Sequence, residues 1–420
     1  MVRTSFAKII LLILILSIFI SAFLFFLNKN KKIQEFTSVT NTTVPLYKGV
    51  GEGVRVTVFA DNVAQVTDIE ITPDGQTLLA ATLTGKIYAF QKIDGQWLRQ
   101  SDLFFDLETF QPGFPPEEAG LTGIVLGADF EKSGDVFLNY SFSPIKKTYK
   151  NRVTRINFTK LGKKIIGLNP KLIFEANTDG SPAHQIQDGV GVMIKNSPHI
   201  LFGIGEGFEA KRALDLTKEA GKLVLIKADG NSPEGTRPYA NSKLQAIGLR
   251  NPPDLTLSPS GQIALVDTGP DHFDRLIYGR LVDTNGENVK RFNFNWDGTE
   301  KSLEKNVANP FGSGNLTLHK WKETETPVAL NFLDDKRLLV TLFGKTGSKE
   351  NKPGKKILLG TITEGLAKKI SFKTLVERDG NGEGQLSQPI GTAVDSTTGD
   401  IYFGDLMEGR IYKVVIGGEF

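Results

Sequence analysis

The segment 183–189 (AHQIQDG) brings several chemically useful side chains into one short stretch. His184 is a candidate general base, because an imidazole titrates near neutral pH and can take a proton from a hydroxyl group. Gln187 and Asp188 follow it and are candidates for holding a polar ligand. The alternative is an ordinary polar surface loop, so the chemistry depends on what lies beside this segment.

A second segment, 248–252 (GLRNP), holds an arginine between a glycine and a proline. Proline fixes its own φ angle and restricts the residue before it, so Arg250 and Asn251 stand on a restrained backbone. A fixed guanidinium group can stabilise negative charge that develops during a reaction. Arg250 is therefore a candidate catalytic residue and Asn251 a candidate ligand contact, with an ordinary surface arginine as the alternative.

A third segment runs from Asp267 to Pro270 (DTGP) and is followed by Asp274. The carbonyl groups of Gly269 and Pro270 lie on a backbone that lacks one N–H donor. Hard cations such as calcium prefer oxygen ligands of this kind. Gly269 and Pro270 are therefore candidate metal ligands, although a simple β-turn would use the same residues.

The composition excludes several classes of site. The 420 residues include no cysteine, which excludes disulfides, thiolate metal sites and a cysteine nucleophile. The four histidines, at positions 184, 199, 272 and 319, are scattered, which argues against a multi-histidine metal centre. The net charge of +3 and the absence of a long like-charged block in the main domain argue against nucleic acid as a partner.

The elements that must position these segments are short strands in a repeat. One pattern occurs six times: a turn with Gly, Asp or Ser, a short β-rich run, a second turn and another strand. The turns fall near residues 74, 133, 197, 260, 335 and 399. The stretch of chain between two successive turns is about as long as a four-stranded blade with one long loop. Propellers have roughly 4–8 blades, so six copies fit this architecture. The sequence therefore predicts an all-β fold, a six-bladed β-propeller, over residues 51–420.

Two other β architectures fit the repeat less well. A pair of β-sandwiches does not predict six similar hairpins at one period, and a β-helix has a much shorter repeat. No long amphipathic helix is visible, and the stretch 206–216 is at most one short helix. Propellers bind ligands at the end of the central channel, so we expect Arg250 at its mouth. We expect the region 55–59 or its neighbour to complete the last blade.

The N-terminus carries a membrane-length apolar run. Residues 9–27 (IILLILILSIFISAFLFFL) form 19 residues without a charge, and a helix of this length nearly spans a hydrocarbon core of ~30 Å. A cleaved signal peptide is the alternative, but its apolar region is normally shorter and ends at a small-residue cleavage site. We therefore expect a single-pass membrane protein.

The predicted domain order follows from this run. Residues 1–30 form the anchor and residues 31–50 form a polar, Thr-rich linker. The propeller is expected on the extracytoplasmic side, although the basic residues balance across the anchor and do not set its orientation.

Several segments together resemble a known family. They are 120–130 with 134–140, 151–155 (NRVTR), 205–207 (GEG), 221–223 with 229–230, 248–252 (GLRNP), 268–270 (TGP) and 389–414. In this order, over residues 61–414, they resemble the glucose/sorbosone dehydrogenase family, the soluble quinoprotein sugar dehydrogenases. The resemblance rests on the ordered set of motifs and not on any single one.

The resemblance implies a six-bladed propeller that binds pyrroloquinoline quinone with calcium and oxidises a small-molecule sugar at the anomeric carbon. A histidine serves as general base in this family, and an arginine stabilises the reduced quinone. Arg250 matches that arginine and Asn251 its neighbour, while Gly269 and Pro270 match the segment whose carbonyl groups bind calcium.

The position of the base departs from the family pattern, which has H-N-G-G-x-L a fixed distance before the next strand. Counting back without a gap places Gln187 and Asp188 there, as candidate cofactor contacts, and glutamine cannot take up a proton at neutral pH. His184 lies three residues earlier and serves as base only if the loop is rearranged. The ungapped count slightly favours Gln187 beside Arg250 with His184 facing solvent, which would give binding without turnover.

Two functions from other classes remain open beside the sugar dehydrogenase. One is a non-catalytic propeller that binds carbohydrate or protein. The other is a calcium-dependent lactonase-type hydrolase, which needs Glu, Asn and Asp residues around a metal in the channel, and the sequence offers no convincing set.

Overall fold

The computed structural model describes eleven stretches of the chain: residues 36–39, 44–113, 120–145, 148–178, 181–233, 243–282, 292–310, 314–344, 355–365, 368–379 and 387–417. Within them, the strands form six sheets. The expected anchor at 9–27 lies outside these stretches. Among the described residues, no helix is both long enough and apolar enough to cross a membrane.

The first three sheets follow one another along the chain. Sheet one contains β4 (Val66–Ile71), β5 (Thr77–Thr82), β6 (Lys86–Ile93) and β7 (Gln96–Gln100), with β8 (Phe105–Asp106) paired to β6. Sheet two contains β9 (Leu121–Leu126), β10 (Asp135–Ile145), β11 (Thr148–Leu161) and β12 (Lys164–Asn177). Sheet three contains β13 (Ile186–Ile194), β14 (Ser197–Ile204), β15 (Lys222–Lys227), β16 (Leu244–Ile247) and β20 (Phe292–Asn293).

The next three sheets complete the ring. Sheet four contains β17 (Leu255–Leu257), β18 (Ile263–Asp267), β19 (His272–Gly279) and β21 (Thr317–Glu323). Sheet five contains β22 (Pro327–Phe332), β23 (Arg337–Leu342), β24 (Lys356–Thr363) and β25 (Lys369–Arg378). Sheet six contains β26 (Pro389–Val394), β27 (Ile401–Asp405), β28 (Arg410–Ile416) and the early strand β3 (Val54–Ala60).

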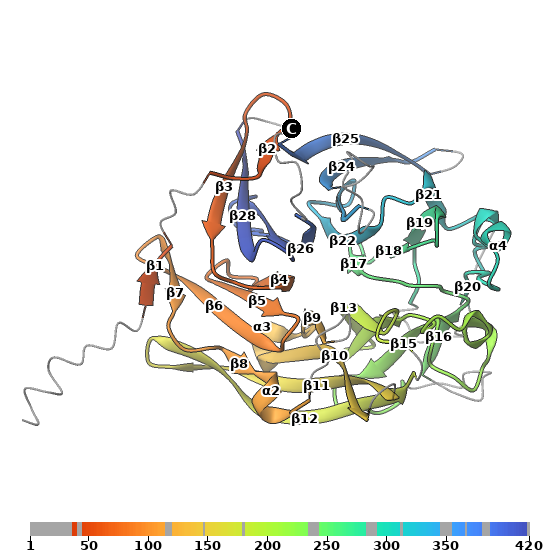
Figure 1. Cartoon of the computed structure of the whole chain (residues 1–420), viewed down its shortest axis with the longest axis horizontal. Coiled ribbons are helices and arrows are strands. Elements are labelled where there is room, and N and C mark those ends of the chain that lie inside the picture. Colours follow the sequence, from red (N-terminus) through yellow and green to blue (C-terminus); the bar gives the residue numbers. More distant parts are fainter. Residues whose placement is uncertain are drawn as a thin grey trace, which may run out of the picture.

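The six sheets are the blades of a propeller (Figure 1), as the repeat predicts. The first strand of each blade, β4, β9, β13, β17, β22 or β26, packs against the first strands of its neighbours around the centre. The six turns singled out in the sequence join this first strand to the second. The strands that follow these turns are the second and third of each blade. The β-sandwich and β-helix alternatives are therefore wrong.

The hydrophobic core is divided among the blade interfaces. The described residues form six large buried clusters, and each cluster contains residues from two neighbouring blades. Between blades three and four, for example, Leu201 and Leu225 pack with Leu265 and Ile277. Because one sheet buries its faces only against its neighbours, a blade outside the ring would expose them.

Polar bonds reinforce these interfaces next to the channel. Asp68 on β4 accepts the backbone N–H of Ile124 on β9 at 2.7 Å. Asp254 accepts the N–H of Leu330 on β22 at 2.5 Å. Gly123 allows β9 to approach blade three closely, since a Cβ atom there would lie 2.4 Å from Asp188 Oδ1. The inner strands are thus fixed to each other in register.

The N-terminal segment closes the ring. β3 pairs with β28 in an antiparallel ladder that joins Val56 to Val414. This confirms the expectation that the region 55–59 completes the last blade. Since β3 precedes the first blade in sequence, the final sheet contains both ends of the propeller chain.

Two further strands precede β3, within the segment 31–50 that was expected to be a linker. β1 (Phe36–Ser38) pairs with β7 at the edge of blade one, and β2 (Tyr47–Gly49) pairs with β25 at the edge of blade five. Tyr47 is 1% exposed and its hydroxyl donates to Asp405 at 2.6 Å. The polar residues of these strands show little apolar periodicity and therefore give no strand signal. The strands are held by the edges of blades one and five, with which they pair.

Helices in the described residues are short. They are α2 (Leu107–Phe110), α3 (Phe130–Ser133), α4 (Glu300–Glu304) and the 3-10 helix η1 (Ala210–Leu214). η1 lies within the stretch 206–216 in which one short helix was expected. All four lie in connections between strands and leave the blades purely β.

Four carboxyl groups approach each other at the channel, from β4, β13 and the start of blade four. They belong to Asp68, Glu70, Asp188 and Asp254. Burial, together with the charges of Asp68 and Asp254, raises the pKa of Glu70 well above its usual value. Burial likewise raises the pKa of Asp68 to about 6. A raised carboxyl pKa means that the folded protein holds its protons more tightly than the unfolded chain does, so stability is lost as the pH rises through the folded pKa.

We predict that Glu70→Gln stabilises the protein at pH 7.5 and leaves it nearly unchanged at pH 4. At pH 4 the Glu70 carboxyl is protonated in the folded state and resembles the amide, whereas at pH 7.5 the amide avoids the cost of a buried carboxylate next to Asp68. The gain at pH 7.5 should be on the order of 1 kcal/mol. Urea unfolding at both pH values measures it.

Glu52→Gln, at an exposed position, is the control and should change stability little at either pH. An equal loss of stability at both pH values for Glu70→Gln would contradict this cost of a buried carboxylate and indicate a lost packing contact instead.

Candidate functional site

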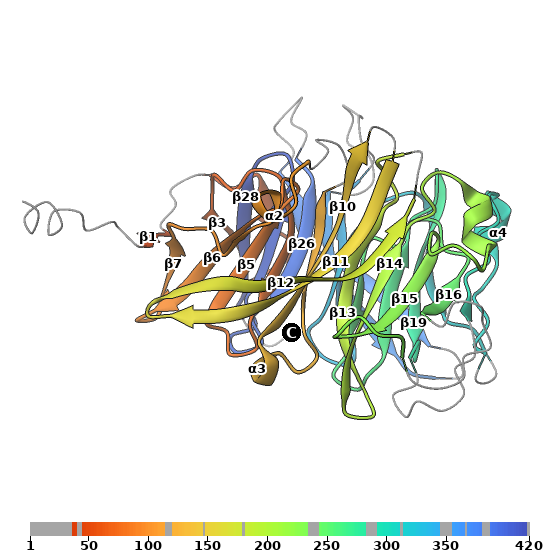
Figure 2. The same cartoon turned by 90° about the horizontal axis from the view of Figure 1, so that it is seen from below.

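The candidate residues gather at one end of the propeller. His184 lies in the connection from β12 to β13, and Arg250 lies in the connection from β16 to β17. Residues 205–221 and 268–271 join the second and third strands of blades three and four. Because neighbouring strands are antiparallel, these connections share one end, and α3 lies at the other (Figure 2). The loops that the sequence singles out therefore lie at the same end of the propeller.

His184 is buried at 8% exposure and forms a carboxylate–imidazole pair. Its Nδ1 lies 2.7 Å from Oε1 of Glu206, which follows β14 and is itself 3% exposed. A carboxylate at Nδ1 favours the tautomer that carries the proton there and leaves Nε2 as an acceptor. The pair can therefore take up a proton at Nε2 while the positive charge is balanced by Glu206.

The backbone around His184 is held on several sides. Gln185 donates its side-chain amide to the carbonyl groups of Thr178 and Ser181, at 3.2 and 2.6 Å. The His184 carbonyl accepts the N–H of Gly207 at 3.2 Å. Gly205 permits this approach, because a Cβ atom there would lie 2.6 Å from the His184 oxygen. His184 itself has φ +57°, a conformation that needs such support.

A buried carboxylate, that of Asp267, holds the backbone of Arg250. Asp267, at the end of β18, accepts the backbone N–H groups of Arg250 and Asn251, both at 3.0 Å. Its other oxygen pairs with Arg275, and both side chains are fully buried. This ion pair neutralises Asp267 and fixes the two residues that precede Pro252.

The Arg250 side chain binds the neighbouring loop, residues 268–271. Its Nη1 donates to the carbonyl groups of Thr268 and Gly269, at 2.8 and 3.0 Å. Burial lowers the pKa of Arg250, and the negative charges of Asp267 and Glu206 oppose that shift. An arginine remains protonated in any case, so the site contains a fixed and partly desolvated positive charge.

Glu206 connects the two halves of the site. Its backbone N–H donates to the carbonyl of Arg250 at 2.9 Å, while its side chain holds His184. His184 and Arg250 are therefore separated by a single linking residue. The structure brings together the base candidate and the cation that the sequence predicts as partners.

Gln187 and Asp188 have other surroundings. The Gln187 backbone carbonyl accepts a hydrogen bond from the side-chain amide of Asn139 at 2.9 Å. Asp188 is one of the four buried carboxyl residues at the channel. β13 has a register shift between Ile186 and Gly189, which an ungapped count cannot include. His184 is buried, so the expectation that it faces solvent is wrong.

The Gly269–Pro270 turn is tied to blade five. Asp274 accepts the N–H of Gly269 at 2.8 Å, and it also accepts the N–H groups of Glu325 and Thr326, at 2.7 and 2.8 Å. The Gly269 carbonyl already accepts from Arg250. Among the described residues, no group of three or more His, Asp or Glu side chains could hold a metal ion. A cation at this turn would depend on carbonyl and ligand oxygens.

Two buried polar atoms beside Arg250 lack partners in the described part of the chain. They are Oδ1 of Asn251 and Nε1 of Trp296, whose ring lies 6.0 Å from the Arg250 guanidinium carbon. Buried polar atoms normally have a hydrogen-bond partner. One unpaired acceptor and one unpaired donor beside a fixed cation are suited to a planar, polar, anionic ligand.

Sequence reasoning missed Glu206 and Trp296. Glu206 stood in the GEG motif, but a motif letter does not show that its carboxylate reaches a histidine in the previous loop. Trp296 lies far along the chain and carries no motif at all.

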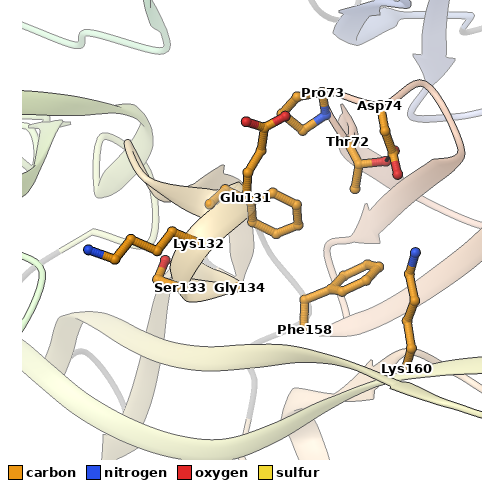
Figure 3. A pocket seen from close by; sticks show the side chains of 10 residues that line it. Thr72, Pro73, Asp74, Glu131, Lys132, Ser133, Gly134, Phe158 and Lys160 are labelled. Carbon is orange, nitrogen blue, oxygen red and sulfur yellow. Dashed lines mark hydrogen bonds between the residues drawn. The ribbon is translucent and has the colours of Figure 1, made fainter.

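A separate cavity of about 480 Å³ lies at the other end of the propeller, between blades one and two. In Figure 3, Thr72, Pro73 and Asp74 line one side, and Phe158 and Lys160 lie across from them. None of the candidate residues lines it, so this cavity does not belong to the site described here.

The family model described as Glucose / Sorbosone dehydrogenase matches residues 63–302, which is more than half of the chain. No curated protein sequence matches the chain.

Solved structures show the same fold. The apo form of the soluble aldose sugar dehydrogenase from Escherichia coli is 17% identical with a TM-score of 0.63, and the match covers 86% of this chain and 99% of that one. The PQQ-bound aldose sugar dehydrogenase from Streptomyces coelicolor is 17% identical with a TM-score of 0.62, and the match covers 86% of this chain and 98% of that one. The holo PQQ domain of pyranose dehydrogenase from Coprinopsis cinerea is 12% identical with a TM-score of 0.58, covering 89% and 98%.

The matched region, 63–302, contains His184, Glu206, Arg250, Asp267 and Gly269, so it includes the whole candidate site. On the strength of the family model and the ring of six blades, this chain belongs to the glucose/sorbosone dehydrogenase family.

Proposed function

We propose that this protein is a sugar dehydrogenase that oxidises an aldose-type sugar at its anomeric carbon, with pyrroloquinoline quinone as the electron acceptor. The observation that carries the proposal is the His184–Glu206 pair, linked through one residue to the fixed cation of Arg250. Oxidation of a hydroxyl-bearing carbon needs a base for the hydroxyl proton and a positive charge near the acceptor.

His184 is the base in this proposal. Its Nδ1 is occupied by Glu206, so Nε2 is free to accept the proton of the sugar C1 hydroxyl. Glu206 holds the ring in place and balances the charge of the imidazolium ion that forms. Pyrroloquinoline quinone, when bound, supplies the acceptor for the two electrons that leave the C1–H bond.

Arg250 supplies the positive charge. Nη1 is held by two carbonyl groups, which fixes the plane of the guanidinium group. Asn251 and Trp296 offer an unpaired acceptor and an unpaired donor beside it, and we assign these three residues to the binding of the cofactor. The family's calcium would use the Gly269 and Pro270 carbonyl groups, which fits because a carbonyl oxygen has two lone pairs and Arg250 occupies one on Gly269.

The alternatives receive less support. A lactonase-type hydrolase needs a metal held by side chains in the channel, and the described carboxyl groups there form no such set. A purely binding propeller has no need of a buried imidazole with a dedicated carboxylate partner.

We predict that the full-length protein, purified in detergent and supplied with pyrroloquinoline quinone and calcium, oxidises aldoses in a dye-reduction assay. His184→Gln should lower kcat by about 100-fold or more, since it removes the base. Quinone binding, followed by its absorbance, should persist in this variant.

His319→Gln is the matched control, because His319 lies on β21 at the outer part of blade four. It should retain the wild-type rate. If Gln187→Ala abolishes turnover and His184→Gln does not, the assignment of the base is wrong. Absence of quinone binding by the wild-type protein would refute the proposed function itself.

We further propose that the protein is anchored in a membrane by residues 9–27, with the propeller on the extracytoplasmic side. The support is the uncharged 19-residue run, which is followed within a short stretch by β1 at the edge of blade one. The anchor would then hold blade one close to the membrane surface.

We predict that removing residues 1–30 moves the protein from the membrane fraction to the soluble fraction without changing its unfolding temperature. This deletion leaves β1 and β2 intact. A deletion of residues 1–50 should also release the protein but lower the unfolding temperature, because it removes Tyr47 and its bond to Asp405. Continued membrane association of both truncated forms would contradict the single-anchor proposal.

A further inference from the structure

Phe208 has an unusual backbone conformation next to the candidate base. Gly207 and Phe208 have φ angles of +64° and +58°, and the N–H of Glu209 donates to the carbonyl of Glu206 at 3.3 Å. Two successive positive φ angles are typical of a type I′ turn, in which glycine is the common residue at the second central position. A phenylalanine there is strained, because its side chain is bulky.

The hydrophobic core does not explain this strain. The Phe208 side chain is 61% exposed, and it belongs to none of the buried clusters of the described residues. Strained residues persist where the surrounding structure enforces them, and they concentrate at functional sites. The contacts of Phe208 are therefore the place to look for the reason that this strained conformation is kept.

Those contacts converge on the His184–Glu206 pair. The Phe208 ring stacks on the His184 ring with centroids 4.0 Å apart and planes inclined by 18°. Its backbone N–H donates to Glu206 Oε1 at 3.2 Å, the same oxygen that lies 2.7 Å from His184 Nδ1. The carboxylate fixes one edge of the imidazole, but a single hydrogen bond leaves the ring free to rotate about the bond direction. A flat ring stacked on its face removes that freedom.

We propose that Phe208 is a positioning residue that fixes the plane of the His184 imidazole and thereby the direction of Nε2. The inference rests on the proposed function of His184 as the base. A base must meet the hydroxyl proton at hydrogen-bond distance and in line, so a tilted ring lowers the rate of proton transfer without weakening sugar binding.

Substitution of Phe208 by residues of different shape tests this. Phe208→Gly relieves the backbone strain, since glycine adopts a positive φ readily, so its unfolding temperature should stay unchanged or rise. Its kcat should fall on the order of 10- to 100-fold, with KM within about 3-fold of wild type. Phe208→Trp keeps a flat ring and should retain most of the rate, whereas Phe208→Leu fills space without a plane and should behave like Phe208→Gly.

Lys195→Gly is the matched control. Lys195 also has a positive φ, +46°, but lies exposed in the β13–β14 turn at the far end of blade three. The unfolding temperature of Lys195→Gly should also stay unchanged or rise, and its kcat should equal that of the wild type.

A readout in the protein without cofactor is the NMR signal of the His184 ring protons, assigned with His184→Gln. Stacking shifts these signals upfield, so they should move downfield in Phe208→Gly and Phe208→Leu and remain shifted in Phe208→Trp.

Three results would overturn the inference alone: wild-type kcat in Phe208→Gly, wild-type kcat in Phe208→Leu, or a raised KM with unchanged kcat, which would place Phe208 against the sugar instead. A wild-type protein without any turnover would overturn the proposed function and the inference with it, and the wild-type rate distinguishes this case.

Discussion

The pairing of β3 with β28 is the interaction on which the remaining structure depends. Each buried cluster lies between two blades, so no blade has a core of its own, and the ring is stable only when the sixth blade meets the first. β1 and β2 extend this closure over the edges of blades one and five. The early part of the chain thus fastens three consecutive blades on their outer side, with Tyr47 buried against Phe403 and Tyr412.

The site depends on the same closure because its parts come from separate blades. Asp267 holds the Arg250 backbone from blade four, Glu206 reaches from blade three, and Asp274 ties the Gly269 turn to the start of blade five. Few of these residues are exposed, and most of their polar groups are paired with one another. Among the buried polar atoms without a partner in the described residues, Asn251 Oδ1 and Trp296 Nε1 lie beside the cation. The ring therefore fixes geometry that a single loop could not hold.

The sequence predicted the blades because the second and third strands of each form apolar hairpins, such as Thr77–Thr82 with Lys86–Ile93. The inner strands gave a weaker signal, since they carry channel-facing polar residues such as Asp68 and Glu70 among apolar ones. The loops of the site were also predictable from Arg250 and His184. The choice between His184 and Gln187 was not, because it depends on a register shift in β13 and on a carboxylate reaching across from Glu206. β1 and β2 were missed because both are short and polar and each pairs with the edge of a blade, β7 of blade one and β25 of blade five, that its own residues do not reveal.

The closure has a consequence for how the protein is made. Tyr47 and its partner Asp405 are 358 positions apart, so the first strands of the ring leave the ribosome long before the last ones exist. β3 must remain without its partner β28 while five blades are synthesised, and such an exposed edge can pair wrongly. Assembly of the propeller can finish only after synthesis of β28, which ends at Ile416. An N-terminus held at a membrane during this interval would keep the waiting strands in one place and away from those of other copies.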